Sequence, residues 1–148
     1  MMIQDLLEAK GSTVVTIGPS ATLVEAARTL VDHRIGALVV VDDDGGMIGI
    51  VSERDLMRAI VTYAEGLFER RVEDVMTRSV ATCAPEDSLV EALSLMGSRR
   101  IRHLPVLVGD TLAGMISIRD VTGEWLGLMD QENRRLRDEV GAQQRRSA

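Results

Sequence analysis

The sequence Gly49-Ile-Val-Ser52-Glu-Arg-Asp55 returns 65 positions later as Gly114-Met-Ile-Ser117-Ile-Arg-Asp120. Upstream of this pair, residues 13–41 carry the same residue type as residues 79–107 at eleven positions, at a shift of 66. Identities that keep their order over such a length indicate an internal duplication. Each copy is roughly 55–60 residues long, a size at which a domain is marginal on its own. We therefore expect the two copies to pack on each other and share one core.

Both copies carry the same element signals, and these predict the order β-α-β-β-α. Thr22-Leu-Val-Glu25 and Ser88-Leu-Val-Glu91 are capping boxes that predict helix starts, and apolar residues at helical spacing follow each of them. Two apolar runs separated by a turn come next and predict paired strands. The predicted strands cover 13–17, 37–41 and 47–51 in the first copy and 79–83, 103–108 and 112–117 in the second. The expected fold class is mixed α/β (α+β), with a last helix that begins at Ser52 and again at Ser117.

The repeats divide the chain into four parts. We predict repeat one with its N-terminal lead-in over residues 1–63, a linker over 64–71, repeat two over 72–125 and a C-terminal helical tail over 126–148. Short helical lead-ins to the two copies are expected at Ile3–Leu7 and Val72–Met76.

The tail carries the pattern of a long helix. We expect this helix to extend the last helix of repeat two from Val121 to Ala148, and fraying after Gly141 belongs to the solvated form of the helix. Its apolar side chains fall roughly on one face, which indicates either a solvated helix or a helix that packs on a second subunit. We favour the second interpretation for residues 121–136.

Composition and charge argue against several classes of protein. The net charge is −6 and aromatic residues make up 2% of the chain, which weigh against nucleic-acid binding and base stacking. The single cysteine, Cys83, excludes an intrachain disulfide, and we expect it to be a buried thiol. Metal-ligand spacing, a P-loop and a nucleophile elbow are absent, so we expect no enzyme, no metal and no required cofactor. Without a signal pattern or a long apolar stretch, the cytoplasm is the expected location and no membrane partner is expected.

The β-α-β-β-α order, found twice with Gly-hydrophobic-hydrophobic-Ser-x-x-Asp closing each copy, resembles the CBS (cystathionine β-synthase) domain pair, or Bateman module. Asp74-Val-Met-Thr-Arg78 and Ile101-Arg-His-Leu-Pro-Val106 are similar to segments of that family. The resemblance covers about residues 3–125, so the chain looks like a stand-alone CBS-domain protein. It implies a regulatory module that senses an adenine nucleotide (AMP, ADP or ATP) between the repeats, modulates a partner protein and forms a homodimer. The alternatives are a dimeric scaffold with vestigial clefts and a pair that binds NAD or S-adenosylmethionine.

The Ser-x-Arg-Asp motif suits the chemistry of an adenosine phosphate. A carboxylate can accept hydrogen bonds from both ribose hydroxyls, while a serine hydroxyl and helix N-terminal N–H groups can hold sugar or phosphate oxygens. An arginine fork neutralises phosphate. The candidate residues are Ser52, Arg54 and Asp55 in copy one and Ser117, Arg119 and Asp120 in copy two. Helix capping alone also explains Ser-x-x-Asp, and the two roles can coexist.

The resemblance adds residues expected to surround the base. They are Ile17, Ile35, Gly36 and Ala37 in copy one and Cys83, Ile101, Arg102, His103 and Leu104 in copy two. Copy two has the basic pair Arg102-His103 where copy one has Gly36-Ala37. For this pair we expect contact with ligand or with a dimer partner, and we expect the cleft containing Arg119 to favour nucleotides with more phosphates.

Overall fold

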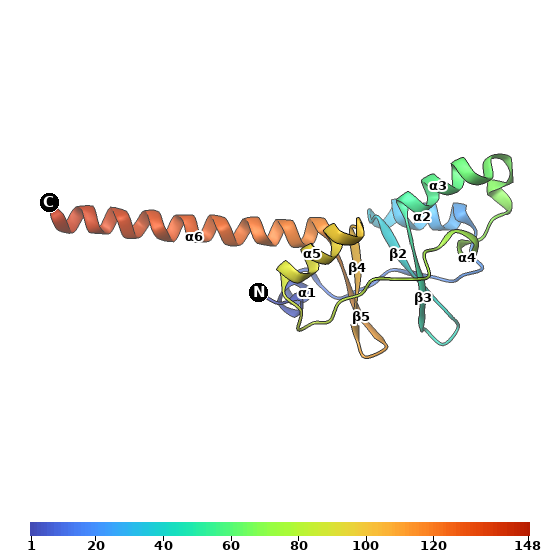
Figure 1. The fold of residues 1–148 in the computed structure, drawn as a ribbon, viewed down its shortest axis with the longest axis horizontal. Helices are drawn as coiled ribbons and strands as arrows, with labels where there is room; N and C mark the ends of the chain where they lie inside the picture. The colour runs from blue at the N-terminus through green and yellow to red at the C-terminus, as the bar shows by residue number, and fades with distance from the viewer.

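Two small sheets, one in each repeat, organise the fold, and the computed structural model describes all residues from 1 to 148 (Figure 1). The first sheet contains β1 (Thr16–Ile17), β2 (Ala37–Val41) and β3 (Met47–Ser52), with β1 parallel and β3 antiparallel to β2. The second sheet is the antiparallel pair β4 (His103–Val108) and β5 (Thr111–Ser117). The mixed α/β fold of two repeats is therefore confirmed.

The strand predictions hold for both hairpins and fall short for the first strand of each repeat. The segment 13–17 forms a strand only over its last two residues. The segment 79–83 makes a single bridge, from Cys83 to Val106. Both segments run alongside a sheet edge without completing a ladder, so β propensity alone overstated their length.

The helices lie beside the sheets, with α2 and α3 against the first sheet and α5 and the start of α6 against the second (Figure 1). Their bounds are α1 (Ile3–Lys10), α2 (Leu23–His33), α3 (Glu53–Tyr63), a 3-10 helix (Ala64–Glu69), α4 (Val72–Val75), α5 (Leu89–Arg99) and α6 (Ile118–Ser147). The predicted capping boxes form, since the N–H groups of Glu25 and Glu91 donate to the hydroxyls of Thr22 and Ser88, both at 3.1 Å. The two copies also share a backbone conformation. The residues that cap the C-termini of α2 and α5, Arg34 and Arg100, both lie in the left-handed region with φ 54°.

The apolar core consists of two clusters, and each repeat completes the cluster of the other. Helix α1, at the start of repeat one, places Ile3, Leu6 and Leu7 in the cluster of repeat two. Conversely, Val72 and Met76, at the start of repeat two, lie in the cluster of repeat one. The expectation of one shared core is wrong, and the repeats are held together by exchanged lead-in segments.

The exchange explains the glycine that opens each closing motif. A Cβ on Gly114 would lie 2.7 Å from Leu7 Cδ2, and a Cβ on Gly49 would lie 2.7 Å from Met76 Sδ. Contacts that short do not occur between real carbon atoms and their neighbours, so any side chain there would push the lead-in out of the core. Both glycines therefore serve close packing.

Helix α6 runs well beyond repeat two, and Figure 1 shows it projecting away from the rest of the chain. It continues to Ser147, nearly the full length expected for the tail helix. Ion pairs between residues one helical turn apart lie along its exposed part, and one of them joins Asp130 and Arg134 at 2.7 Å. None of the helices combines the length and the apolar character that crossing a membrane requires.

The exchange of lead-ins predicts a large effect of a mutation at the extreme N-terminus. Ile3 is fully buried, so Ile3→Ala should lower the free energy of unfolding by about 2–5 kcal/mol, measured by urea denaturation. Glu8→Ala, on the exposed side of the same helix, is the matched control and should change it by less than about 0.5 kcal/mol. Equal effects of the two mutations would show that α1 is not part of the core.

Candidate functional site

A cleft of about 690 Å³ lies between the two repeats. Its walls come from the segment before β1, the start of β2, the end of α1, the start of β4 and the junction of β5 with α6. The residues predicted from sequence that line it are Ile35, Gly36, Ala37, Arg102, His103, Ser117, Arg119 and Asp120. The cleft therefore joins the start of β2 in repeat one to the closing motif of repeat two. The sequence argument had grouped these residues copy by copy, and that grouping is wrong.

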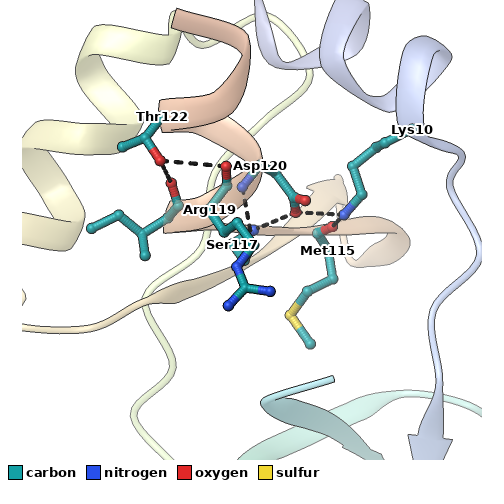
Figure 2. Close-up of polar contacts among 7 residues, drawn as sticks. Lys10, Met115, Ser117, Arg119, Asp120 and Thr122 are labelled. Atoms are coloured by element: carbon teal, nitrogen blue, oxygen red, sulfur yellow. Dashed lines mark hydrogen bonds and ion pairs between the residues drawn. The ribbon is translucent and has the colours of Figure 1, made fainter. Parts of the chain in front are cut away.

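Asp120 is one of the two carboxylates that line this cleft. It begins α6 together with Ser117: the Ser117 N–H donates to Asp120 Oδ2 at 2.8 Å, and the Asp120 N–H donates to Ser117 Oγ at 3.1 Å. Figure 2 shows Lys10 reaching across from α1, where its ammonium donates to Asp120 Oδ2 and to the Met115 carbonyl, both at 2.7 Å. Burial raises the pKa of Asp120, but the hydrogen bonds from Lys10 and Ser117 outweigh it and hold this pKa below its usual value. Asp120 is thus a charged acceptor at neutral pH.

Arg119 precedes this carboxylate on the first turn of α6. Its guanidinium makes no contact with the other residues drawn in Figure 2, and its side chain lines the cleft. An unpaired guanidinium beside a helix N-terminus is a favourable environment for a phosphate group.

The equivalent motif of repeat one has a different environment. Asp55 is only 8% exposed: its Oδ2 accepts from the Ser52 N–H at 2.9 Å and the Ser52 hydroxyl at 3.1 Å, and its Oδ1 accepts from the Thr77 hydroxyl at 3.4 Å. Arg54 donates from Nη1 to the carbonyl of Arg100, the residue that ends α5, at 3.3 Å. All three motif residues make contacts within the fold, and none of them lines the large cleft.

Four other residues proposed for the base pocket lie in or against the cores. Cys83 and Leu104 are buried in the cluster of repeat two, and Ile101 packs against it. Ile17 packs against the cluster of repeat one. Burial, with a smaller contribution from the charge of Asp87, raises the pKa of the Cys83 thiol to about 12, so the predicted buried thiol is confirmed.

His103 and Gly36 meet across the boundary between the repeats. A Cβ on Gly36 would lie 2.9 Å from His103 Cε1, so the imidazole occupies the space that a side chain would need. Burial lowers the pKa of His103, although the charges of Glu53 and Asp120 oppose this effect. His103 is therefore neutral at pH 7 and contributes shape to the cleft more than charge.

Charged side chains give the cleft a positive balance in an acidic protein. The cations are Lys10, Arg34, Arg102 and Arg119, and the carboxylates are Glu53 and Asp120. This balance favours an anionic ligand. Arg99 and Arg100, the other basic residues of the segment, do not line the cleft.

Several cleft residues were missed from the sequence. Thr13, Val14 and Val15 line the cleft from the segment that was expected to be a regular strand, and Glu53 lies inside the closing motif itself. Lys10 was missed because it ends a lead-in helix that was expected to stop at Leu7. The one available signal was that Lys10 is the only lysine of the chain.

The family model of the CBS domain matches residues 5–62 and 72–127. A mitochondrial CBS domain-containing protein of Arabidopsis thaliana is 33% identical over 127 residues, which make up 80% of this chain and 62% of that protein. The chain spans between 32% and 65% of the length of four curated relatives.

Solved structures share the architecture. The CBS-domain containing protein from Agrobacterium tumefaciens is 41% identical with a TM-score of 0.80, covering 82% of this chain and 91% of that one. A protein with CBS domains from Burkholderia ambifaria is 37% identical with a TM-score of 0.82, covering 86% and 95%. A third CBS domain pair, solved in complex with 5′-methylthioadenosine and S-adenosyl-L-methionine, is 23% identical with a TM-score of 0.76 and covers 86% and 97%. The likeness to this third pair shows the fold alone.

The two aspartates should differ in their effect on stability. Asp55→Ala leaves the Ser52 N–H and the Thr77 hydroxyl without their acceptor in a partly buried position, at a cost of roughly 2–3 kcal/mol. Asp120→Ala should cost only about 1 kcal/mol, because Lys10 and Ser117 face an open cleft where water replaces the carboxylate. Urea denaturation of both variants measures the difference. A larger loss for Asp120→Ala would contradict the assigned burial.

Proposed function

This chain belongs to the CBS domain family, and we propose that it is a regulatory module that binds an adenine nucleotide (AMP, ADP or ATP) in the cleft between its repeats and alters contacts with a partner protein. One observation carries the proposal: a cleft large enough for a nucleotide contains a charged carboxylate at a helix N-terminus beside an unpaired arginine. Cavities that hold small molecules commonly measure about 300–1,000 Å³.

Each part of a nucleotide has a partner of matching chemistry. Asp120 is the acceptor for the ribose hydroxyls, since a carboxylate can accept two hydrogen bonds side by side. Arg119 is the donor for phosphate, through its guanidinium and its own N–H, because the neighbouring N–H groups of Ile118 and Asp120 already donate to the Arg102 carbonyl and to Ser117 Oγ. Apolar and backbone groups of Val14, Val15 and Ile35 form the wall for the base.

The charge balance supports a nucleotide over S-adenosylmethionine, which one relative of the same fold holds. The sulfonium of that ligand brings a positive charge into a cleft that already has more cations than carboxylates. A nucleotide brings one or more negative charges instead. NAD carries two phosphates and is the alternative ligand, and calorimetric titration of the wild-type chain with NAD and with AMP distinguishes the two.

The proposed action is binding without catalysis. The Ser117 hydroxyl accepts from the Asp120 N–H, and Asp120 is paired with Lys10, so neither group is poised to activate a nucleophile. We propose the cytoplasm as its location, although the Arabidopsis relative is mitochondrial by name.

Arg119→Ala tests the phosphate contact. Only AMP presents a phosphate, so this variant should weaken AMP binding about ten- to a hundredfold and leave adenosine binding nearly unchanged, by calorimetric titration of protein freed of co-purified ligand. Arg54→Ala is the matched control at the equivalent position of repeat one, and it should change neither ligand. The AMP preference should also shrink as salt is raised. Equal losses for the two ligands would show that Arg119 supports the sugar or the fold, and a wild-type chain that binds neither would favour the scaffold function.

We also propose a homodimer that forms through the helices. A groove of about 340 Å³ runs over α2, α3 and the 3-10 helix, and eight of its ten lining residues are hydrophobic. Among them Val31, Ile60 and Phe68 are exposed. Trp125 and Leu126 of α6 are exposed as well. Apolar surface of this extent is typical of an interface.

Light scattering at tens of micromolar should report twice the monomer mass. Ile60→Glu should shift this mass toward the monomer, because it introduces a charge into the apolar groove. Val108→Glu is the control, since Val108 is equally exposed but lies at the hairpin end of β4, away from the helices. A wild-type monomer, or equal responses of the two variants, would refute the helix-mediated dimer.

A further inference from the structure

Lys10 lines the cleft and is held there by hydrogen bonds, but none of the nucleotide contacts proposed above involves it. It ends α1, and its ammonium makes two hydrogen bonds of 2.7 Å, to Asp120 Oδ2 and to the Met115 carbonyl. The same carboxylate oxygen accepts from the Ser117 N–H. With Oδ2 occupied in this way, Asp120 has only Oδ1 left for a ribose that offers two hydroxyls.

In repeat one, the backbone and the side chain of Thr77 make the two equivalent hydrogen bonds. The Thr77 N–H donates to the carbonyl of Ile50 at 2.8 Å, and the Thr77 hydroxyl donates to Asp55. Ile50 and Met115 are equivalent positions at the shift of 65 that relates the closing motifs. Lys10 in repeat two therefore makes the two hydrogen bonds that Thr77 makes in repeat one. One goes to the equivalent backbone carbonyl and the other to the aspartate of the closing motif.

The contact between Thr77 and Asp55 and the contact between Lys10 and Asp120 differ in how easily a ligand can replace them. Thr77 is fixed, because its carbonyl also accepts from the Ile50 N–H at 3.0 Å, and Met76 beside it is buried in the core. Asp55 itself is only 8% exposed, so a ligand reaches it only after the packing around it opens. The Lys10 and Asp120 side chains are 32% and 26% exposed, and a lysine can leave by rotation of its side chain.

We propose that Lys10 is a displaceable lock on Asp120: it holds the carboxylate in the empty cleft, gives way to the ribose of an entering nucleotide, and then adds its charge to those that attract the phosphate. The inference rests on the proposed function and extends it to regulation of the same site. Because Thr77 keeps Asp55 closed, one nucleotide binds per chain. Displacement of Lys10 also ties occupancy of the cleft to α1, the helix that completes the core of repeat two.

Calorimetric titration of Lys10→Met with adenosine and with AMP tests the lock. Methionine has a similar length and cannot donate, so adenosine should bind several-fold more tightly once its competitor is gone. The ratio of AMP affinity to adenosine affinity should fall roughly fivefold, since one cation has left the cleft. Lys10→Arg should restore the ratio. Arg137→Met, which removes a positive charge from the far part of α6, is the matched control and should change neither value.

The outcomes separate the lock from the proposed function. Weaker adenosine binding by Lys10→Met, an unchanged ratio, or two adenosine sites per wild-type chain would each overturn the lock while nucleotide binding stands. A wild-type chain that binds neither ligand would overturn both. Thermal denaturation of each variant shows whether it folds.

A chemical measurement tests the lock without any nucleotide. Because Lys10 is the only lysine, a short pulse of an acetylating ester can modify only Lys10 and the N-terminal amine, and mass spectrometry resolves the two. Asp120→Asn removes the charge that holds the ammonium, so acetylation of Lys10 should become several-fold faster while that of the N-terminus stays constant. An unchanged rate at Lys10 would overturn the lock.

Discussion

The carboxylate that closes each repeat has two oxygens, and the helix that follows uses one of them. In both repeats Oδ2 of the aspartate accepts from the N–H of the serine that begins the helix, at 2.9 Å for Asp55 and 2.8 Å for Asp120. This bond completes the helix N-terminus, where backbone donors lack partners. Whatever else contacts the same carboxylate then decides whether the motif serves the fold alone or can also serve a ligand.

The exchange of lead-ins determines those further contacts. Since α1 packs into repeat two and α4 into repeat one, a residue at or just beyond the end of each lead-in reaches the closing motif of the repeat it has joined. In one case this residue is Thr77, and in the other it is Lys10. The interaction that holds the repeats together is thus also the one that brings a cation to Asp120.

The sequence contained enough to predict most helices, both hairpins and the duplication. Capping boxes and apolar periodicity are local signals, and Thr22 and Ser88 form the caps they predicted. The presence of Gly36 and Asp120 in one cleft could not be predicted, because a comparison of two copies aligns equivalent residues and says nothing of which ones lie together in space. Lys10 lay beyond prediction for a further reason: its reach depends on how far α1 extends and on which core that helix joins.

The two closing motifs share Gly, Ser, Arg and Asp, but their aspartates have different surroundings. Asp55 is buried and bonded to Ser52 and Thr77, so its contribution is to stability. Asp120 is closed by one flexible side chain at the edge of a positively charged cleft, so its contribution to the fold is smaller and its access to ligand greater. Under the proposed function, the ligand therefore meets the aspartate of repeat two, while the aspartate of repeat one stays part of the fold.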